Sequence, residues 1–128
     1  MTDFNNKPQY WLVGANWGGT DKTEMFVRRG YWEMGYDDDQ KPDYAQLRDK
    51  MKKGDRIAIK SRGGKRAEHI NIKAVGVVKE VDSNEGRVYV DWILSGIDRK
   101  VPSRGKFRTI HPPLSEEHKE WVHSIFRI

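Results

Sequence analysis

The sequence predicts an α+β fold in which short helices pack around a curved antiparallel sheet or partly open β-barrel. Apolar residues alternate with polar ones over 56–60, 68–81 and 88–94, and this period of two is typical of strands. Other segments, 21–29 and 116–126, carry helix start and stop signals instead. The chain is 34% charged, but 11% of its residues are aromatic, which favours a packed core over disorder.

The first half of the chain predicts two strands and two helices. Residues 1–8 form a loose lead-in, and 9–128 form a single domain of ordinary size. A strand over 9–15 leads to a short helix over 21–29, since Asp21 and Glu24 have the spacing of a capping box. Gly30 fits the end of that helix, and an extended segment over 31–36 follows.

A second helix begins at Pro42, runs to Lys52 and Lys53, and stops at Gly54. A long strand over 68–81, with a bulge at Gly76, is then joined to the next strand by a turn at 82–86.

Two further elements close the chain. A strand over 104–111 is expected to end at Pro112 and Pro113, and Ser115 caps a last helix over 116–126. The predicted strands are mostly consecutive and hairpin-linked, which suits antiparallel pairing.

Composition excludes several classes of protein. The chain has no Cys, so disulfides, thiol catalysis and cysteine zinc sites are impossible. No window approaches the roughly 18 apolar residues of a membrane span, and the first residues have no apolar signal core. We therefore expect a cytoplasmic protein without a membrane partner. The net charge of +5 is compatible with a polyanionic partner.

The sequence holds no recognisable catalytic or metal-binding constellation. His118 and His123 are five residues apart on one predicted helix, so they point in directions about 140° apart. The acidic run Asp37–Asp39 lacks the spacing of a calcium loop. The segment Gly14–Gly19 matches neither phosphate-binding glycine motif. We expect no enzymatic activity, no cofactor and no metal.

Aromatic residues beside glycines are the first candidate site. Trp17 precedes two glycines, and Trp32 and Tyr36 lie close to Gly30 and Gly35. Glycine-bordered aromatic rings can form a flat-walled pocket for a planar ligand, which in a basic protein suggests a nucleobase. The other tryptophans sit in predicted strands or helices and are expected in the core: Trp11, Trp92 and Trp121.

Basic residues gather in two stretches. One is a loop that contains Lys60, Arg62, Lys65 and Arg66, and the other contains Lys106 and Arg108 on either side of Phe107. Lys106 and Arg108 share strand parity and would point the same way. The two stretches predict either a surface that follows a nucleic-acid backbone or ordinary solvated loops.

These motifs resemble a known family. The run Tyr10–Gly19, the short helix, Gly30-Tyr31-Trp32 and the later Gly54–Ser61 are similar to the EVE domain of the PUA-like superfamily. EVE-type modules occur at the N-termini of modification-dependent restriction proteins, and YTH domains, which read methylated adenine in RNA, are related. The resemblance spans residues 9–110 and implies a PUA/EVE-like fold.

The resemblance implies a non-catalytic reader that flips a methylated or otherwise modified DNA base into an aromatic cage. Trp32, in the Gly-x-Trp position, would be one wall; Trp17 is inferred as the second, with Tyr36 as a further candidate. The remaining base-binding candidates are Asn16, Lys60 and Ser61. The phosphate-binding candidates are Arg62, Lys65, Arg66, Lys106 and Arg108.

The implied partners are modified DNA first and RNA second, with an effector nuclease or NTPase as a separate domain or subunit. Two alternatives stay open. The chain could read modified bases in RNA, or it could bind a small planar ligand such as a nucleoside or another metabolite.

Overall fold

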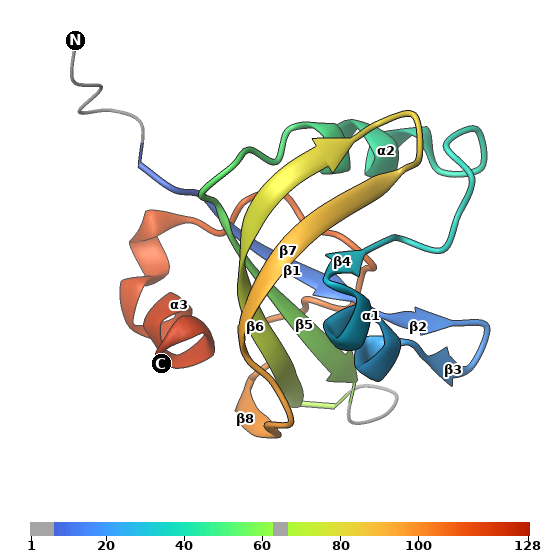
Figure 1. Ribbon diagram of the computed structural model, residues 1–128. Coiled ribbons are helices and arrows are strands. Elements are labelled where there is room, and N and C mark those ends of the chain that lie inside the picture. Colours follow the sequence, from blue (N-terminus) through green and yellow to red (C-terminus); the bar gives the residue numbers. More distant parts are fainter. Residues whose placement is uncertain (1–6, 63–66) are drawn as a thin grey trace, which may run out of the picture.

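The computed structural model describes residues 7–62 and 67–128, and Figure 1 shows their arrangement. The expected lead-in over 1–8 lies mostly outside the described residues, as do Lys65 and Arg66. The strands are β1 Tyr10–Gly14, β2 Asn16–Trp17, β3 Thr20–Asp21, β4 Tyr31–Trp32, β5 Arg56–Arg62, β6 His69–Asp82, β7 Arg87–Leu94 and β8 Arg99–Pro102. The helices are α1 Thr23–Arg29, α2 Pro42–Asp49, the 3-10 helix η1 Glu116–His118 and α3 Lys119–Phe126.

The α+β class is confirmed, but the sheet is mixed rather than antiparallel. Its strand order is β1-β5-β6-β7-β4, with β8 paired to β6. The first pair, β1 and β5, is parallel and in register from Tyr10 with Arg56 to Gly14 with Lys60. Between these strands the chain passes through α1, β4 and α2, a crossover long enough to permit parallel pairing. Within the described residues the sheet is curved and does not close into a barrel.

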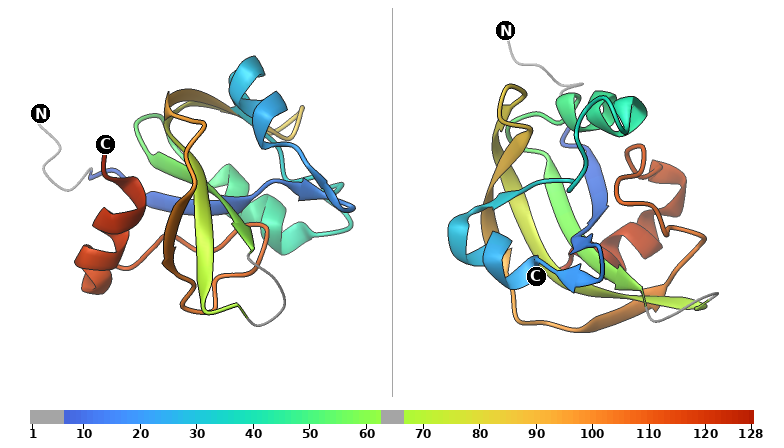
Figure 2. Two further views of the ribbon diagram at one scale, coloured as in Figure 1. Left: turned by 90° about the horizontal axis from the view of Figure 1, so that it is seen from below. Right: turned by 90° about the vertical axis from the view of Figure 1, so that its right-hand side faces the viewer.

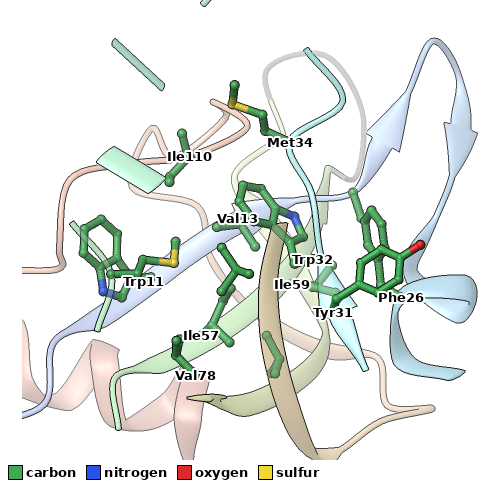
Figure 3. Packing of buried hydrophobic residues seen from close by; sticks show 14 of the residues in the cluster. Trp11, Val13, Phe26, Tyr31, Trp32, Met34, Ile57, Ile59, Val78 and Ile110 are labelled. Atoms are coloured by element: carbon green, nitrogen blue, oxygen red, sulfur yellow. The ribbon is translucent and has the colours of Figure 1, made fainter. Parts of the chain in front are cut away.

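Alternation along β1 and β5 creates a core on each face of the sheet. Trp11 and Val13 face a core that includes residues of α1 and β4, whereas Leu12 faces a second core under α3. Successive strand residues point to opposite faces, so a sheet with apolar residues at every position needs cover on both sides. Figure 2 shows α1 and α3 on opposite sides of the strands, and Figure 3 shows the first core.

The long strand β6 changes partners along one edge. Its first residues pair with β8 and its later residues pair with β7. The register against β7 shifts between Val75 and Gly76 and again between Val78 and Glu80. An irregularity therefore does occur at Gly76, but the extra residue there is Ile93 on β7, whereas the extra residue on β6 is Lys79. These bulges bend the strands.

The helix boundaries differ in detail from the prediction. The cap of α1 is Lys22, without a side-chain hydrogen bond, so the expected capping box does not form. Instead, Asp21 accepts hydrogen bonds from the N–H and hydroxyl of Thr23. Gly30 ends the helix in the left-handed conformation with φ 78°, as expected. The second helix, α2, begins at Pro42 but ends at Asp49, several residues early.

Predictions for the C-terminal third are partly wrong. No strand covers 104–111: the chain turns at Arg104 and Gly105, which have φ of 49° and 73°, and only an isolated bridge joins Ile110 to Val13. The actual strand, β8, was not predicted. The last helix is present as η1 followed by α3, and the Ser115 side chain accepts from the N–H of Glu117 at 3.2 Å. Among the described helices, none has the length and apolar character needed to cross a membrane.

Candidate functional site

The two basic stretches meet where β1 and β5 end. Because these strands are parallel, their carboxyl ends, Gly14 and Lys60, lie at the same edge of the sheet. The N–H of Gly14 donates to the carbonyl of Thr109 at 2.7 Å, which draws the segment 104–111 across that edge. Five side chains gather there, and we call them the basic cluster: Lys60, Arg62, Lys106, Arg108 and His111.

Lys60 is the buried member of this cluster. Its side chain comes from the buried half of β5 and is only 5% exposed. A Cβ atom placed on Gly14 would lie 3.6 Å from its Nζ, an ordinary contact distance, so the amine lies directly beside the end of β1. Burial, together with the charge of Arg62, lowers the pKa of Lys60 to about 8. At neutral pH the group is an ammonium with incomplete solvation, which an incoming anion would stabilise.

His111 is the second buried member of the basic cluster and is 3% exposed. Its Nε2 accepts a hydrogen bond from the N–H of Arg108 at 3.0 Å, which requires an unprotonated Nε2. Burial lowers the pKa of His111 to about 4, and the charges of Lys60, Lys106 and Arg108 act in the same direction. His111 is therefore neutral and holds the 108–111 turn in place.

The arginines of the cluster lie over aromatic rings. The guanidinium of Arg62 is 5.0 Å from the ring centre of Phe107, and that of Arg108 is 5.1 Å from the ring centre of Tyr44. Arg108 also contacts Asp43 at 3.3 Å, but both side chains are largely exposed and such a pair contributes little. The cation–π contacts hold the two guanidinium groups near the surface without burying them.

Tyr44 connects the basic cluster to a second aromatic ring. Its ring centre lies 6.1 Å from that of Tyr36, and the two rings meet edge to face. The Nζ of Lys41 lies over both, at 5.5 Å from Tyr36 and 5.3 Å from Tyr44. We call Tyr36, Lys41 and Tyr44 the tyrosine platform. Tyr36 is 44% exposed, so part of its ring is open to a ligand.

A cavity of about 360 Å³ adjoins this platform, and both Trp17 and Tyr36 line it. Its walls come from the β2–β3 hairpin, the segment 33–38, Arg48 of α2 and the β6–β7 turn. Two carboxylates of the lining are paired with arginines: Asp38 with Arg48 at 2.7 Å and Glu33 with Arg87 at 2.8 Å. Asp37 and Glu85 also line the cavity, and their oxygens could accept hydrogen bonds from a ligand such as the amino group of a base.

Trp17 is fixed by packing on the wall of that cavity. Its ring meets Phe26 edge to face at 5.7 Å, and Lys22 lies 5.6 Å from its ring centre. The backbone of Gly35 lies so close that an added Cβ would be 2.6 Å from the indole. The indole Nε1 is buried and has no hydrogen-bond partner in the described part of the chain, an uncommon and costly state for a donor.

Trp32 lies in the core. Its side chain is 0% exposed and packs with Val13 and Ile59 in the first core (Figure 3). Its Nε1 donates to the carbonyl of Gly14 at 2.8 Å. The Gly-x-Trp motif thus supplies a buried anchor here. A base could stack on this ring only if it became uncovered, so its role as a cage wall stays a prediction.

The remaining candidates divide between local roles and the rim. The side-chain oxygen of Asn16 accepts from the N–H of Gly19 at 2.8 Å, so it closes the β2–β3 turn. Ser61 is half-buried on β5 beside Lys60. Lys65 and Arg66 lie outside the described residues. The structure therefore brings Lys60, Arg62, Lys106 and Arg108 together, and separately Trp17 with Tyr36.

Three further residues have positions that the sequence did not predict. Tyr44 had the spacing of an apolar helix face, Lys41 lay in an apparent loop, and His111 preceded two prolines. Only a three-dimensional contact, such as Arg108 over Tyr44, reveals their connection. In the described part of the chain no three His, Asp or Glu side chains are grouped to hold a metal.

Comparisons with known proteins add little. No protein-family model matches the chain, and no curated protein matches it. Among solved structures it is similar to Rpa0253 from Rhodopseudomonas palustris, a structural-genomics target determined by NMR, with 17% identity and a TM-score of 0.45 over 91% of this chain and 92% of that chain. A similarity of this degree does not bear on the site.

Proposed function

We propose that this chain is a non-catalytic nucleic-acid-binding module that reads a modified base in DNA. The observation that carries the proposal is the path from the basic cluster through Arg108 and Tyr44 to Tyr36 and its cavity. Phosphate-binding and base-binding groups are thereby adjacent, although they come from distant parts of the sequence. The EVE-like motifs support the same reading.

The basic cluster would hold the phosphates. The positive charges of Arg62, Lys106 and Arg108 lie at one edge of the sheet. The ammonium group of Lys60 beside them is largely shielded from water. Such contacts position a nucleic acid but do not distinguish sequences. Each phosphate neutralised releases counterions, so binding should weaken steeply with salt.

The tyrosine platform and the adjoining cavity would take a base. Stacking on an aromatic ring contributes roughly 1–3 kcal/mol per base, and Tyr36 has an open face for it. The carboxylates of Asp37 and Glu85 on the cavity lining could accept hydrogen bonds from an exocyclic amino group. A buried methyl group on the base would contribute on the order of 0.8 kcal/mol.

Fluorescence anisotropy with one duplex in four versions tests this proposal: unmodified, 5-methylcytosine, 5-hydroxymethylcytosine and N6-methyladenine. We expect one modified version to bind more tightly than the unmodified duplex, with quenching of tryptophan fluorescence. Tyr36→Ala should reduce that preference, because it removes the exposed ring. Lys79→Ala is the matched control, since Lys79 is exposed on β6 and belongs to neither group.

The other outcomes identify the alternatives. Tighter binding to a matched single-stranded RNA than to any duplex would replace DNA with RNA as the target. A thermal shift with nucleosides, without salt-dependent binding of any polynucleotide, would favour a pocket for a small planar ligand. Equal binding to all four duplexes would refute base reading while leaving phosphate binding in place.

A further inference from the structure

A second cavity lies between α3 and the sheet, away from the basic cluster. Its volume is about 500 Å³, which is within the range of small-molecule sites. The apolar lining comes from the start of β1, the bulged part of the sheet, the 112–115 connection and α3. These residues are Tyr10, Val75, Ile93, Leu114, Val122 and Phe126.

A β-bulge places one of these side chains. Across the register shift, Val75 pairs with Leu94 and Gly76 pairs with Trp92, so Ile93 has no partner of its own on β6. A bulge redirects the extra side chain, and Ile93 is 46% exposed at the cavity.

The rim of the cavity is positively charged. Four basic side chains line it, Lys7, Arg56, Lys119 and Arg127, together with His123 and Ile128, and none of the described side chains of the lining is acidic. One guanidinium nitrogen of Arg56 donates to the carbonyl of Gly54, which leaves its other N–H groups available. Lys119 and Arg127 are exposed, and neither takes part in an ion pair within the described residues.

We propose that this cavity binds a small amphipathic anion, a carboxylate attached to an unbranched apolar chain. The apolar lining around Ile93 and Phe126 would bury the chain, so that affinity rises with each methylene buried. The carboxylate would lie at the rim beside Lys119 and Arg127, which form no ion pair within the described residues. This site is independent of the basic cluster and does not rest on nucleic-acid binding.

Three ligands with the same tail test the charge requirement: decanoate, decanol and decyltrimethylammonium, each below its micelle-forming concentration. Isothermal titration and amide chemical-shift changes report binding and its location. We expect saturable binding of decanoate with shifts centred on Ile93, Val122 and Phe126. Decanoate should bind at least tenfold more tightly than decanol, and the ammonium compound least of all.

Two variants separate the tail site from the rim. Ile93→Glu changes an exposed side chain and should weaken decanoate binding at least tenfold without lowering Tm. Lys119→Ala with Arg127→Ala should reduce the decanoate affinity to that of decanol. The charge-matched control is Arg28→Ala with Arg29→Ala on α1, which packs on the other face of the sheet, and it should bind decanoate normally.

Equal affinity for the three ligands would overturn the proposal, as would shifts located elsewhere. So would normal decanoate binding by Ile93→Glu.

Discussion

The backbone N–H of Arg108 donates to Nε2 of the buried His111 at 3.0 Å. This bond links a charged surface residue to a neutral ring beneath it, and it is lost when Nε2 takes up a proton. The turn that carries Lys106 and Arg108 therefore depends on the protonation state of one histidine. Protonation of His111 in acid should therefore disturb the basic cluster.

Stability should fall as the pH is lowered from about 6.5 to about 4. The pKa of His111 is about 4 in the folded chain, below the ordinary value near 6.5. The unfolded state thus binds more protons in this interval, and the stability present above pH 6.5 is lost as the pH falls through 4. The loss should be on the order of 3 kcal/mol. Urea unfolding at several pH values measures this loss, and His111→Gln should remove it. If the pH dependence of the free energy of unfolding were the same in this variant, the prediction would be wrong.

Affinity for DNA should decline as the pH rises above about 8. The pKa of Lys60 lies near that value because of burial and the Arg62 charge, so its ammonium attracts phosphate below pH 8 and is neutralised above it. Anisotropy titrations between pH 7 and 9.5 measure the effect. Lys60→Met should bind more weakly at pH 7 and change little over the interval. If this variant and the natural protein share one pH profile, Lys60 does not contact the ligand.

Trp32→Ala should lower the free energy of unfolding by roughly 3–5 kcal/mol, as expected for loss of a large buried aromatic side chain. Any loss of binding in that variant reports on folding. Trp32→Phe keeps part of the packing, but it removes the hydrogen bond to Gly14 and leaves a smaller cavity. It should therefore cost less than Trp32→Ala and more than the roughly 1 kcal/mol of one hydrogen bond. Denaturant unfolding and the four-duplex assay should be run on both. Selective loss of modified-base preference in folded Trp32→Phe would mean that this ring is reached by the base after all.

Gly35→Ala should destabilise the wall of the Trp17 cavity. Gly35 has φ +81°, and an added Cβ would lie 2.6 Å from the indole. The unfavourable backbone conformation alone costs on the order of 1–2 kcal/mol, and the indole must also move. We expect a lower Tm and a shifted tryptophan emission, whereas Gly18→Ala, with open space around its Cβ, should cause only the backbone part. Equal effects of the two substitutions would argue against close packing of Trp17 on Gly35.

Strand positions could be predicted because the apolar period is a local property. Alternation along 56–60 and 68–81 located β5 and β6. Trp11 on β1 and Trp121 on α3 are buried as expected, whereas Trp92 on β7, also expected in the core, is only half-buried. The parallel pairing of β1 with β5 could not be predicted in this way, because it depends on the path of the crossover between them. The strand expected over 104–111 does not form. Its first two residues, Arg104 and Gly105, have left-handed backbone conformations and turn the chain there.

The sequence predicted which basic residues form the candidate site better than it predicted how the site is arranged. The basic residues Lys60, Arg62, Lys106 and Arg108 do converge, but the strand parity argued for the last two does not apply. A glycine near a tryptophan does not indicate whether other parts of the chain cover the ring, so the burial of Trp32 could not be predicted. Tyr44 was missed because its helical spacing is the same for a core residue and for a platform beneath Arg108.

The measurement that tests the central claim most directly is the salt dependence of binding to an unmodified duplex. Each phosphate contact contributes a slope of roughly 0.9 in log affinity against log salt. Arg62→Ala with Lys106→Ala should therefore reduce the slope by about 2. Lys53→Ala with Lys79→Ala should leave it unchanged, because Lys53 precedes the start of β5 and Lys79 lies near the far end of β6. Equal slopes for the natural protein and the Arg62 and Lys106 variant would contradict the proposal that the basic cluster holds the nucleic-acid backbone.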